Sequence, residues 1–394
     1  MYFVGIDISK YKHDCFIVTE AGEVIKDTFT FDNTRTGFVQ FFSILDGLGP
    51  KNEIKIGLEA TGHYMNNLMK HLSVKGYSFI LLNPIIVSRF RHSETLRRTK
   101  TDKVDAKLIA QVIASKDFSS YPLQAYHFPD LKTLTRLRDR LIKQRSLYLV
   151  MLTNQLDLSF PEFKEFFDGN LKSKTAQFIL TKYGTSNRIA NMNSQSFELL
   201  RKVSHGKFSY VKFAKLKELA KNTIGCSSEI DEMLFTQTIN LYQSIDKAIT
   251  EVESKIAEIM EKLDSPTESI PGIGMMSAAT IIAEYGDVSR FANDGQMLAY
   301  AGLDSGRYQS GTSDFPGRMV KHGSGYLRQA LMNVSETCMI HVPSFYDYYL
   351  KKRNEGKPHR VALSHIARKL VRLIYKLEMS RTHFDLSVFN SQHQ

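Results

Sequence analysis

YFVGIDIS, residues 2–9, is the stretch that decides the fold of the first part of the chain. Its aromatic and β-branched residues predict a strand, and Asp7 is an acid among apolar neighbours. Two further runs of this kind, HDCFIVTE (13–20) and VIKDTFTF (24–31), follow after Lys, Gly and Glu residues. The three runs therefore predict three strands joined by hairpins.

The next segments alternate between helical and extended patterns. They are TGFVQFFSILDGL (36–48), EIKIGLEA (53–60), HYMNNLMKHLSVKG (63–76) and YSFILLNP (77–84). We expect a helix, a strand, a helix that ends at Gly76 and a strand that ends at Pro84. Three antiparallel strands followed by this βαβα pattern predict an α/β domain with a mixed sheet.

The middle of the chain has the pattern of two long helices. From about 130 to 160, Leu134, Leu137 and Leu141 form one apolar stripe, and residues 235–263 follow a heptad that is broken only at Thr238. The heptad fits either an intramolecular hairpin or a dimer seam. Between the two helices, residues 161–228 are expected to be a mostly helical insertion with no assigned role.

A third region opens after Pro266 with SIPGIGMMSAATIIAEYGD. Pro271, Gly272 and Gly274 predict a tight turn before a helix. The backbone N–H groups at that helix start can cradle a phosphate, or the turn can be an ordinary one. We therefore expect three domains. They cover residues 1–128, 129–265 and 266–394.

Composition indicates an ordinary globular protein with a basic surface. Of the 394 residues, 42% are hydrophobic and 24% are charged. The net charge of +11 favours a polyanionic partner, although a merely basic cytosolic protein is the alternative. We find no signal peptide and no apolar run long enough for a membrane span. Three widely spaced cysteines, Cys15, Cys226 and Cys338, fit a reducing cytoplasm.

Asp7 and Glu59 are candidate metal ligands. A carboxylate inside an apolar strand is costly unless it binds a cation or a donor, although a plain strand-end aspartate remains an alternative for Asp7. Glu59 ends the strand 53–60, and adjacent central strands would bring the two carboxylates together. Two carboxylates at one site indicate a divalent cation. His63 is interpreted as a supporting or packing residue.

The stretch RRTKTDKVDAKLIA, residues 97–110, adds two acids. Thr101 is the expected N-cap, which places Asp102 and Asp105 on one face of the first helical turn. Acids there also simply favour the helix dipole. Together with Asp7 and Glu59, however, they follow the order of acids in the Mg²⁺ site of an RNase H-like nuclease. Arg97, Arg98, Lys100, Lys103 and Lys107 are then expected to hold a nucleic-acid backbone.

The region 300–335 contains a candidate nucleophile. Ser310 lies between Gln309 and Gly311 in a glycine-rich loop, and Arg318, Lys321 and His322 follow it. A serine needs a base or a metal to become a nucleophile. On spacing alone Ser310 is more simply a turn residue, and the nearby Ser305, Ser313 and Ser324 compete with it.

These motifs together resemble the DEDD-type insertion-sequence transposases, which include the Piv-type DNA invertases. The resemblance rests on GIDISK, GLEATGHY and RRTKTDKVDAKLIA near the start, and on IPGIGMMSAATIIAEYGDVSRF, LAYAGL, YQSG and KHGSGYLRQAL later in the chain. It implies a RuvC-like, RNase H-like N-terminal domain, a coiled-coil connection and a mostly α-helical C-terminal serine domain. One departure is Leu303-Asp304-Ser305, where the family commonly has a proline after Gly-Leu.

The resemblance also implies a chemistry. Asp7, Glu59, Asp102 and Asp105 would bind Mg²⁺, and Ser310 would be the covalent nucleophile toward DNA, with Arg318 and Lys321 among the nucleic-acid contacts. The two halves of the site would come from different protomers of a dimer or tetramer. A structured noncoding RNA, the bridge RNA, would pair with donor and target DNA. Such an enzyme would act at the nucleoid in a prokaryotic cytoplasm.

Three other functions compete with recombination. A RuvC-type Holliday-junction endonuclease would use the acids and need no serine. GIDIS is also similar to the first phosphate loop of actin-like sugar kinases, but a second phosphate loop is missing from the expected place. A non-catalytic nucleic-acid-binding scaffold would need none of the four acids.

Overall fold

The computed structural model of this chain describes residues 1–59, 64–82, 87–88, 90, 102–115, 127–226, 228–310, 313–321 and 323–386, without the side chains of 102–103, 127, 305–310 and 313–318. These residues form two compact units. The first comprises Met1–Tyr126 with Gly286–Asn293, and the second comprises His127–Tyr285 with Asp294–Gln394. The division into three domains stays a prediction. The expected features at Pro84, Thr101, His63 and His322 lie outside the described residues.

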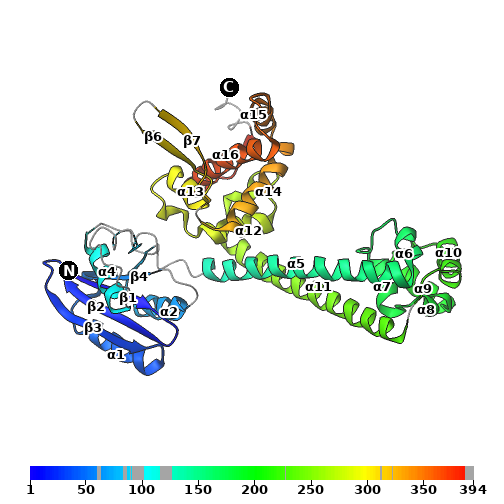
Figure 1. The fold of residues 1–394 in the computed structure, drawn as a ribbon, viewed down its shortest axis with the longest axis horizontal. Coiled ribbons are helices and arrows are strands. Elements are labelled where there is room, and N and C mark those ends of the chain that lie inside the picture. The colour runs from blue at the N-terminus through cyan, green and yellow to red at the C-terminus, as the bar shows by residue number, and fades with distance from the viewer. Residues whose placement is uncertain are drawn as a thin grey trace. The chain divides into compact units, whose positions relative to one another are not determined.

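The first unit is built on a mixed five-stranded sheet (Figure 1). Its strands are β1 (Tyr2–Ile8), β2 (Lys12–Thr19), β3 (Val24–Asp32), β4 (Ile54–Glu59) and β5 (Phe79–Leu82), in the order β3-β2-β1-β4-β5. The first three strands pair antiparallel, whereas β1, β4 and β5 pair in parallel. The sequence predicted all five strands, and the mixed sheet is confirmed.

Helices cover both faces of this sheet. They are α1 (Arg35–Asp46), α2 (Met65–Lys75) and α4 (Asp102–Ser115), and a short 3₁₀ turn, η1 (Lys51–Glu53), precedes β4. Val4 and Ile6 of β1 belong to a core with α1 and α2, whereas Phe3 belongs to a second core with α4. Successive side chains of β1 therefore alternate between the two helical layers. Gly76 ends α2 in the left-handed region, as expected for a helix-terminating glycine.

Helix α4 packs against the sheet over two glycines. A Cβ on Gly5 would lie 2.2 Å from the carbonyl oxygen of Ala106, and one on Gly57 would lie 3.0 Å from side-chain carbons of Ile109 and Ile113. Gly5 and Gly57 are partners in the parallel β1–β4 register. The missing side chains therefore allow the helix to lie directly over the central strands.

The second unit contains a hairpin of two long helices, α5 (His127–Ser159) and α11 (Glu229–Leu263). Arg138 contacts Glu253 at 2.7 Å and Arg145 contacts Asp246 at 2.6 Å, so the two helices run antiparallel. Thr238, where the heptad breaks, is buried and accepts a 3.1 Å hydrogen bond from Gln155 Nε2. The break is therefore a satisfied polar contact between the helices.

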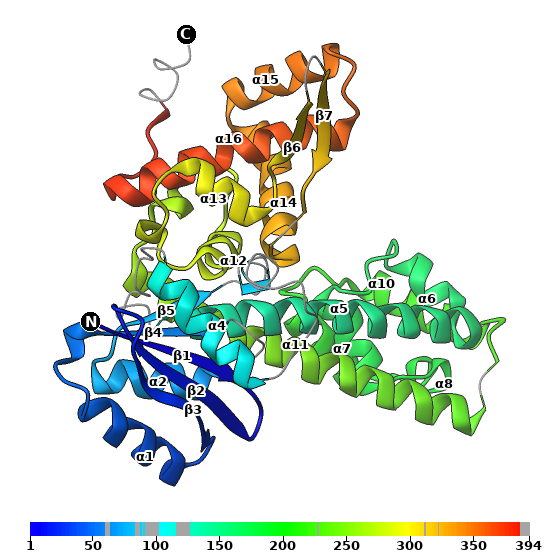
Figure 2. The same cartoon turned by 60° about the vertical axis from the view of Figure 1, so that its left-hand side comes forward.

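Five short helices lie between α5 and α11 in the chain, at one end of the hairpin (Figure 1 and Figure 2). They are α6 (Pro161–Phe166), α7 (Lys174–Lys182), α8 (Ser186–Ala190), α9 (Ser194–Val203) and α10 (Tyr210–Lys221). We call this segment the insertion module. Its buried residues, such as Phe163, Ile179 and Leu216, form one core with Leu152 of α5 and Phe235 of α11.

The remaining elements continue the chain from the other end of the hairpin. They are η2 (Pro266–Ser269), α12 (Met275–Tyr285), η3 (Val288–Arg290), α13 (Asp294–Ala301), β6 (Ser305–Ser310), β7 (Ser313–Met319), α14 (Gly325–His341), α15 (Pro343–Asn354) and α16 (His359–Ser380). This part is mostly helical, as expected. The prediction of a glycine-rich loop around Ser310 is wrong, because β6 and β7 form an antiparallel hairpin there.

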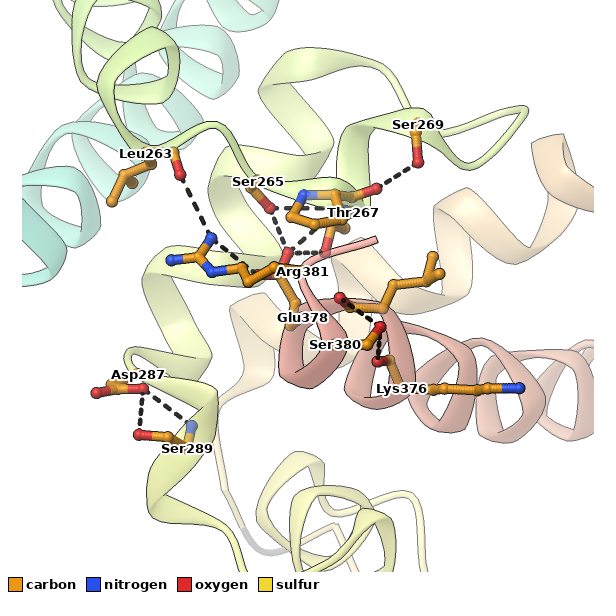
Figure 3. Close-up of polar contacts among 12 residues, drawn as sticks. Leu263, Ser265, Thr267, Ser269, Asp287, Ser289, Lys376, Glu378, Ser380 and Arg381 are labelled. Carbon is orange, nitrogen blue, oxygen red and sulfur yellow. Dashed lines mark hydrogen bonds and ion pairs between the residues drawn. The ribbon is translucent and has the colours of Figure 1, made fainter. Parts of the chain in front are cut away.

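Glu378 of α16 holds the start of this helical part in place (Figure 3). Its carboxylate accepts hydrogen bonds from the Ser265 hydroxyl, from the Thr267 hydroxyl at 2.6 Å and from the Thr267 N–H at 3.2 Å. Nearby, Gly272 adopts φ +95°, and a Cβ on it would lie 2.6 Å from the backbone nitrogen of Cys338. Packing against α14 thus explains this glycine of the expected tight turn. Across the part of the chain that the structure describes, no helix is long and apolar enough to cross a membrane.

Candidate active site

The first two candidate acids lie side by side at the ends of parallel strands. Ile6 of β1 is paired with Leu58 of β4, so the next residues, Asp7 and Glu59, occupy the same register position. Both side chains are half-buried. Ile6 and Leu58 belong to the core on the α1 and α2 face of the sheet. Successive side chains of a strand point to opposite faces, so Asp7 and Glu59 point to the α4 face. This is the edge where α/β sheets carry their functional groups.

Helix α4 adds the other two acids. It begins at Asp102, which places Asp102 and Asp105 in its first turn, as the sequence predicted. Asp105 is 4% exposed and directly precedes Ala106, the residue that lies over Gly5. Gly5 is two residues before Asp7 on the same face of β1. The close packing over Gly5 therefore holds the first turn of α4 against the strand that carries Asp7.

The sheet contains one more carboxylate that sequence reasoning missed. Asp14 of β2 is directly opposite Asp7 in the antiparallel β1–β2 register. It is 2% exposed and accepts a 2.9 Å hydrogen bond from the Thr30 hydroxyl. Like charges on directly opposed residues are destabilising in a sheet. Only the strand register could have revealed the pairing of Asp7 with Asp14, because the sequence around Asp14 indicates nothing more than a polar residue in a hairpin.

The chemistry of these side chains fits a hard divalent cation. Carboxylate oxygens are the ligands that Mg²⁺ takes from proteins, and Asp7, Glu59 and Asp105 supply them on one face of the sheet. Within the residues that the structure describes, no three His, Cys, Asp or Glu side chains are close enough together to hold a metal ion. The side chain of Asp102 lies outside that set.

The predicted nucleic-acid contacts are only partly described. Lys107 is exposed on α4, with its Nζ 5.9 Å from the ring centre of Phe16. Lys321 is exposed after β7 and adopts φ +52°. Arg97, Arg98 and Lys100 lie outside the described residues, as do the side chains of Lys103 and Arg318.

Ser310 is the last residue of β6, and its register partner Ser313 is the first residue of β7. The backbone thus places Ser310 at the turn end of a two-stranded hairpin in the second unit, whereas the acids belong to the first unit. Of the competing serines, Ser324 has another role, because its hydroxyl caps α14 by accepting a 3.3 Å hydrogen bond from the Leu327 N–H. Ser305 is at the opposite end of β6 from Ser310.

Glu284 of α12 is a buried carboxylate that the sequence did not single out. It accepts hydrogen bonds from Arg136 Nε at 2.6 Å and from Arg136 Nη2 at 3.0 Å, and Lys132 Nζ lies 3.4 Å away. Burial by itself would raise the pKa of Glu284, but the hydrogen bonds from Arg136 and Ser324 and the charge of Lys132 hold it below its usual value. Glu284 therefore connects α5 to the cap of α14.

Two protein families match this chain over separate parts. A DEDD transposase family of the IS110 type matches residues 4–161, which include α4 and the sheet from Val4 onward. A second family, described as transposase IS116/IS110/IS902, matches residues 265–350, which include the β6–β7 hairpin and α14. The two matches thus fall on the parts that carry the candidate acids and the candidate serine.

Full-length relatives span nearly the whole chain. An uncharacterized 44.8 kDa protein of insertion element IS116 from Streptomyces clavuligerus is 25% identical over 95% of this chain and 94% of its own length. The transposase of insertion sequence IS1111A from Coxiella burnetii is 22% identical over 95% and 88%, respectively. The pilin gene-inverting protein of Moraxella lacunata is 23% identical over 97% of both chains.

Proposed function

This chain is a DEDD transposase of the IS110/IS116 family, a DNA strand-transfer enzyme, and from that premise we propose that it recombines DNA by serine attack at a Mg²⁺-dependent site. The observation that carries the proposal is the shared register position of Asp7 and Glu59 beneath the first turn of α4. Carboxylates gathered there need cations to offset their repulsion.

In this proposal Asp7, Glu59, Asp102 and Asp105 hold Mg²⁺, which would polarise the scissile phosphate and stabilise the displaced oxygen. The packing of α4 over Gly5 keeps Asp105 in place against β1. Lys103 and Lys107 on α4, with Arg97, Arg98 and Lys100 before it, bind the DNA backbone. Arg318 and Lys321 bind it on the side of the serine.

Ser310 carries the covalent step. Its Oγ forms a bond to phosphorus while the bond from phosphorus to a sugar oxygen breaks, and the serine proton leaves with that sugar hydroxyl. A hydroxyl from the second DNA strand then displaces Oγ and restores both a phosphodiester and the serine. The enzyme-linked ester conserves the energy of the broken bond, which simple hydrolysis would lose. Rejoining therefore needs no external energy source.

We further propose that the site is completed within a homo-oligomer, dimer or tetramer, where Ser310 of one protomer meets the acids of another. The α5–α11 hairpin would act as the coiled-coil connection between the two halves. The coiled-coil connection is supported by four buried residues at heptad spacing on α11: Phe235, Tyr242, Ile249 and Ile256. A structured noncoding RNA would guide the choice of donor and target DNA, and the basic composition agrees with a nucleic-acid partner.

The proposal is tested by recombination between two plasmids that carry the ends and the target of the element. Asp105→Asn and Ser310→Ala are each expected to abolish recombinant product, whereas Ser313→Ala, the register partner of Ser310 on β7, retains it. Gel analysis under denaturing conditions should detect DNA covalently attached to the wild-type chain and none attached to Ser310→Ala. Full recombination by Ser310→Ala would remove serine from the mechanism and favour a RuvC-type nuclease.

A further inference from the structure

The insertion module carries most of the net charge of the chain. Residues 161–228 contain twelve Lys and Arg against five Asp and Glu, a net charge of +7 out of +11. Three of these cations are tied to groups nearby in the structure as described: Lys164 lies 3.7 Å from Asp157, Lys217 bonds the carbonyl of Met192, and Lys182 lies over the rings of Phe178 and Tyr183. The module thus has a strong positive field that its own acids do not neutralise.

The charges gather around the turn between α9 and α10. We define the α9–α10 patch as Arg201, Lys202, Lys207, Tyr210, Lys212 and Lys215, all of which are exposed. Within the described part of the chain, none of its five cations is in an ion pair. A ring contact between Phe197 of α9 and Phe213 of α10, with centres 5.4 Å apart, holds the two helices together beneath the patch.

Helix stability does not explain the charges on α10. Arg201 and Lys202 are in the last turn of α9, where cations favour the helix dipole. Lys212, however, is in the first turn of α10, which contains no acid, and Lys215 follows three residues later on the same side. A cation in a first turn opposes the dipole. A local cost without a structural return is typical of a functional surface.

Tyr210 gives the patch an aromatic platform. The side chain is 66% exposed at the start of α10, next to Val211, which is 76% exposed. The Tyr210 ring contacts Phe197 edge to face, with ring centres 5.4 Å apart and an interplanar angle of 88°. One side of the ring is thereby supported by the core while the rest faces solvent. Such a ring has no partner on a smooth duplex, whose bases are stacked inside, but it can stack with an unpaired base.

We propose that the α9–α10 patch binds an unpaired stretch of nucleic acid, with Tyr210 stacking on a base and Lys207, Lys212 and Lys215 contacting phosphates. The patch includes none of the candidate acids and not Ser310, and the proposal does not depend on the strand-transfer chemistry. Single-stranded RNA and single-stranded DNA share the chemistry that the patch recognises. A duplex shares only the phosphates.

The test uses the full chain with fluorescent 20-nucleotide oligouridine, the matching oligothymidine and a 20-base-pair DNA duplex. Tyr210→Ala is expected to weaken binding of a single strand about tenfold, because base–aromatic stacking has that effect when removed, and to leave duplex binding unchanged. Lys207→Glu/Lys212→Glu/Lys215→Glu should weaken all binding and flatten its salt dependence. Whichever single strand, oligouridine or oligothymidine, loses more affinity in Tyr210→Ala identifies RNA or DNA as the natural ligand of the patch.

Two controls separate the patch from general effects. Tyr346→Ala removes another exposed tyrosine, 48% exposed on α15, and Lys247→Glu/Lys262→Glu reverses exposed cations on α11. Both variants should bind like wild type. Photo-crosslinking with 4-thiouridine should map to the peptide around Tyr210. Unchanged single-strand binding by Tyr210→Ala, or an equal loss for duplex, would overturn the proposal. Because these assays measure binding alone, a failure of the proposed catalysis would remain distinguishable.

Discussion

Arg136 donates two parallel hydrogen bonds to the Glu284 carboxylate, from Nε to Oε1 at 2.6 Å and from Nη2 to Oε2 at 3.0 Å. The Glu284 side chain is 0% exposed, whereas that of Arg136 is 35% exposed. The pair joins α5, 148 residues earlier in the chain, to α12. Glu284 is buried, whereas Arg136 can reach water. Truncating Arg136 leaves a buried charge without its main partner, so it should destabilise the fold more than truncating Glu284 does.

Arg136→Ala leaves a buried carboxylate with Lys132 as its nearest cation, and we expect it to lower the free energy of unfolding by about 3 kcal/mol. Arg136→Ala/Glu284→Gln should be more stable than Arg136→Ala, because it also removes the buried charge. Arg138→Ala, which breaks the half-exposed pair with Glu253, is the matched control and should cost less than about 1 kcal/mol. Urea denaturation measures all three. Equal losses for Arg136→Ala and Arg138→Ala would contradict this account.

The same pair should respond to acid. The pKa of Glu284 is held below its usual value, so its carboxylate stabilises the fold above about pH 4.5, the ordinary range of a glutamate. That stability is lost as the pH falls through the lowered pKa. The difference in unfolding free energy between wild type and Glu284→Gln should therefore shrink below that range. A constant difference from pH 7 down to pH 3 would argue against the lowered pKa.

His13 should make the first unit sensitive to mild acid. It is fully buried on β2, against the rings of Phe31 and Phe38. Burial lowers its pKa more than the neighbouring Asn33 and Asp14 raise it. Below about pH 6.5 the unfolded chain therefore binds a proton that the folded chain does not, and stability falls by up to about 1.4 kcal/mol per pH unit. His13→Leu should lose this part of the pH slope between pH 7 and 5; an identical slope would refute it.

Gly5→Ala should separate α4 from the sheet. The new Cβ would lie 2.2 Å from the Ala106 carbonyl oxygen and 2.4 Å from the Ala110 nitrogen, and neither backbone atom can move without shifting the helix. We expect a loss of about 3 kcal/mol or more in stability. Gly47→Ala is the control in the same unit, because its Cβ would meet nothing closer than 3.5 Å. Comparable melting temperatures for the two variants would be inconsistent with tight α4 packing.

Local patterns explain how much of this fold could be predicted. The strands β1 to β5 are short runs rich in β-branched and aromatic residues, and the long helices have an apolar stripe at helical spacing, so local patterns reveal both. The β6–β7 hairpin was missed because glycine and proline interrupt its pattern: Arg307 is paired with Pro316, near a register shift. Proline is tolerated there since β7 pairs only with β6.

The sequence indicated the candidate acids and part of their arrangement, but not the contacts that depend on strand register and on residues far away in the chain. Asp7, Glu59 and Asp102 with Asp105 were recognisable from strand ends and a helix start. The pairing of Asp7 with Asp14 depends on strand register, and the burial of Glu284 depends on an arginine far away in sequence. The charge of the insertion module was visible in the sequence, but its gathering at the α9–α10 turn depends on how the helices pack.

Mg²⁺ should stabilise the wild-type chain through Asp7. A ligand that binds only the folded state raises stability by about 1.4 kcal/mol when present at roughly ten times its dissociation constant. We therefore expect 10 mM Mg²⁺, about the excess that a weak carboxylate site requires, to raise the melting temperature of wild type. Asp7→Asn should lose the rise.

The control for this experiment is Glu20→Gln. It removes one exposed carboxylate at the opposite end of β1, where the Glu20 N–H bonds the Met1 carbonyl at 3.1 Å. If the effect of Mg²⁺ were only general screening of charge, Asp7→Asn and Glu20→Gln would reduce it equally. A specific site predicts that Glu20→Gln keeps the full shift. Equal shifts in all three chains would place the cation away from Asp7, and the acids at the sheet edge would then need another role.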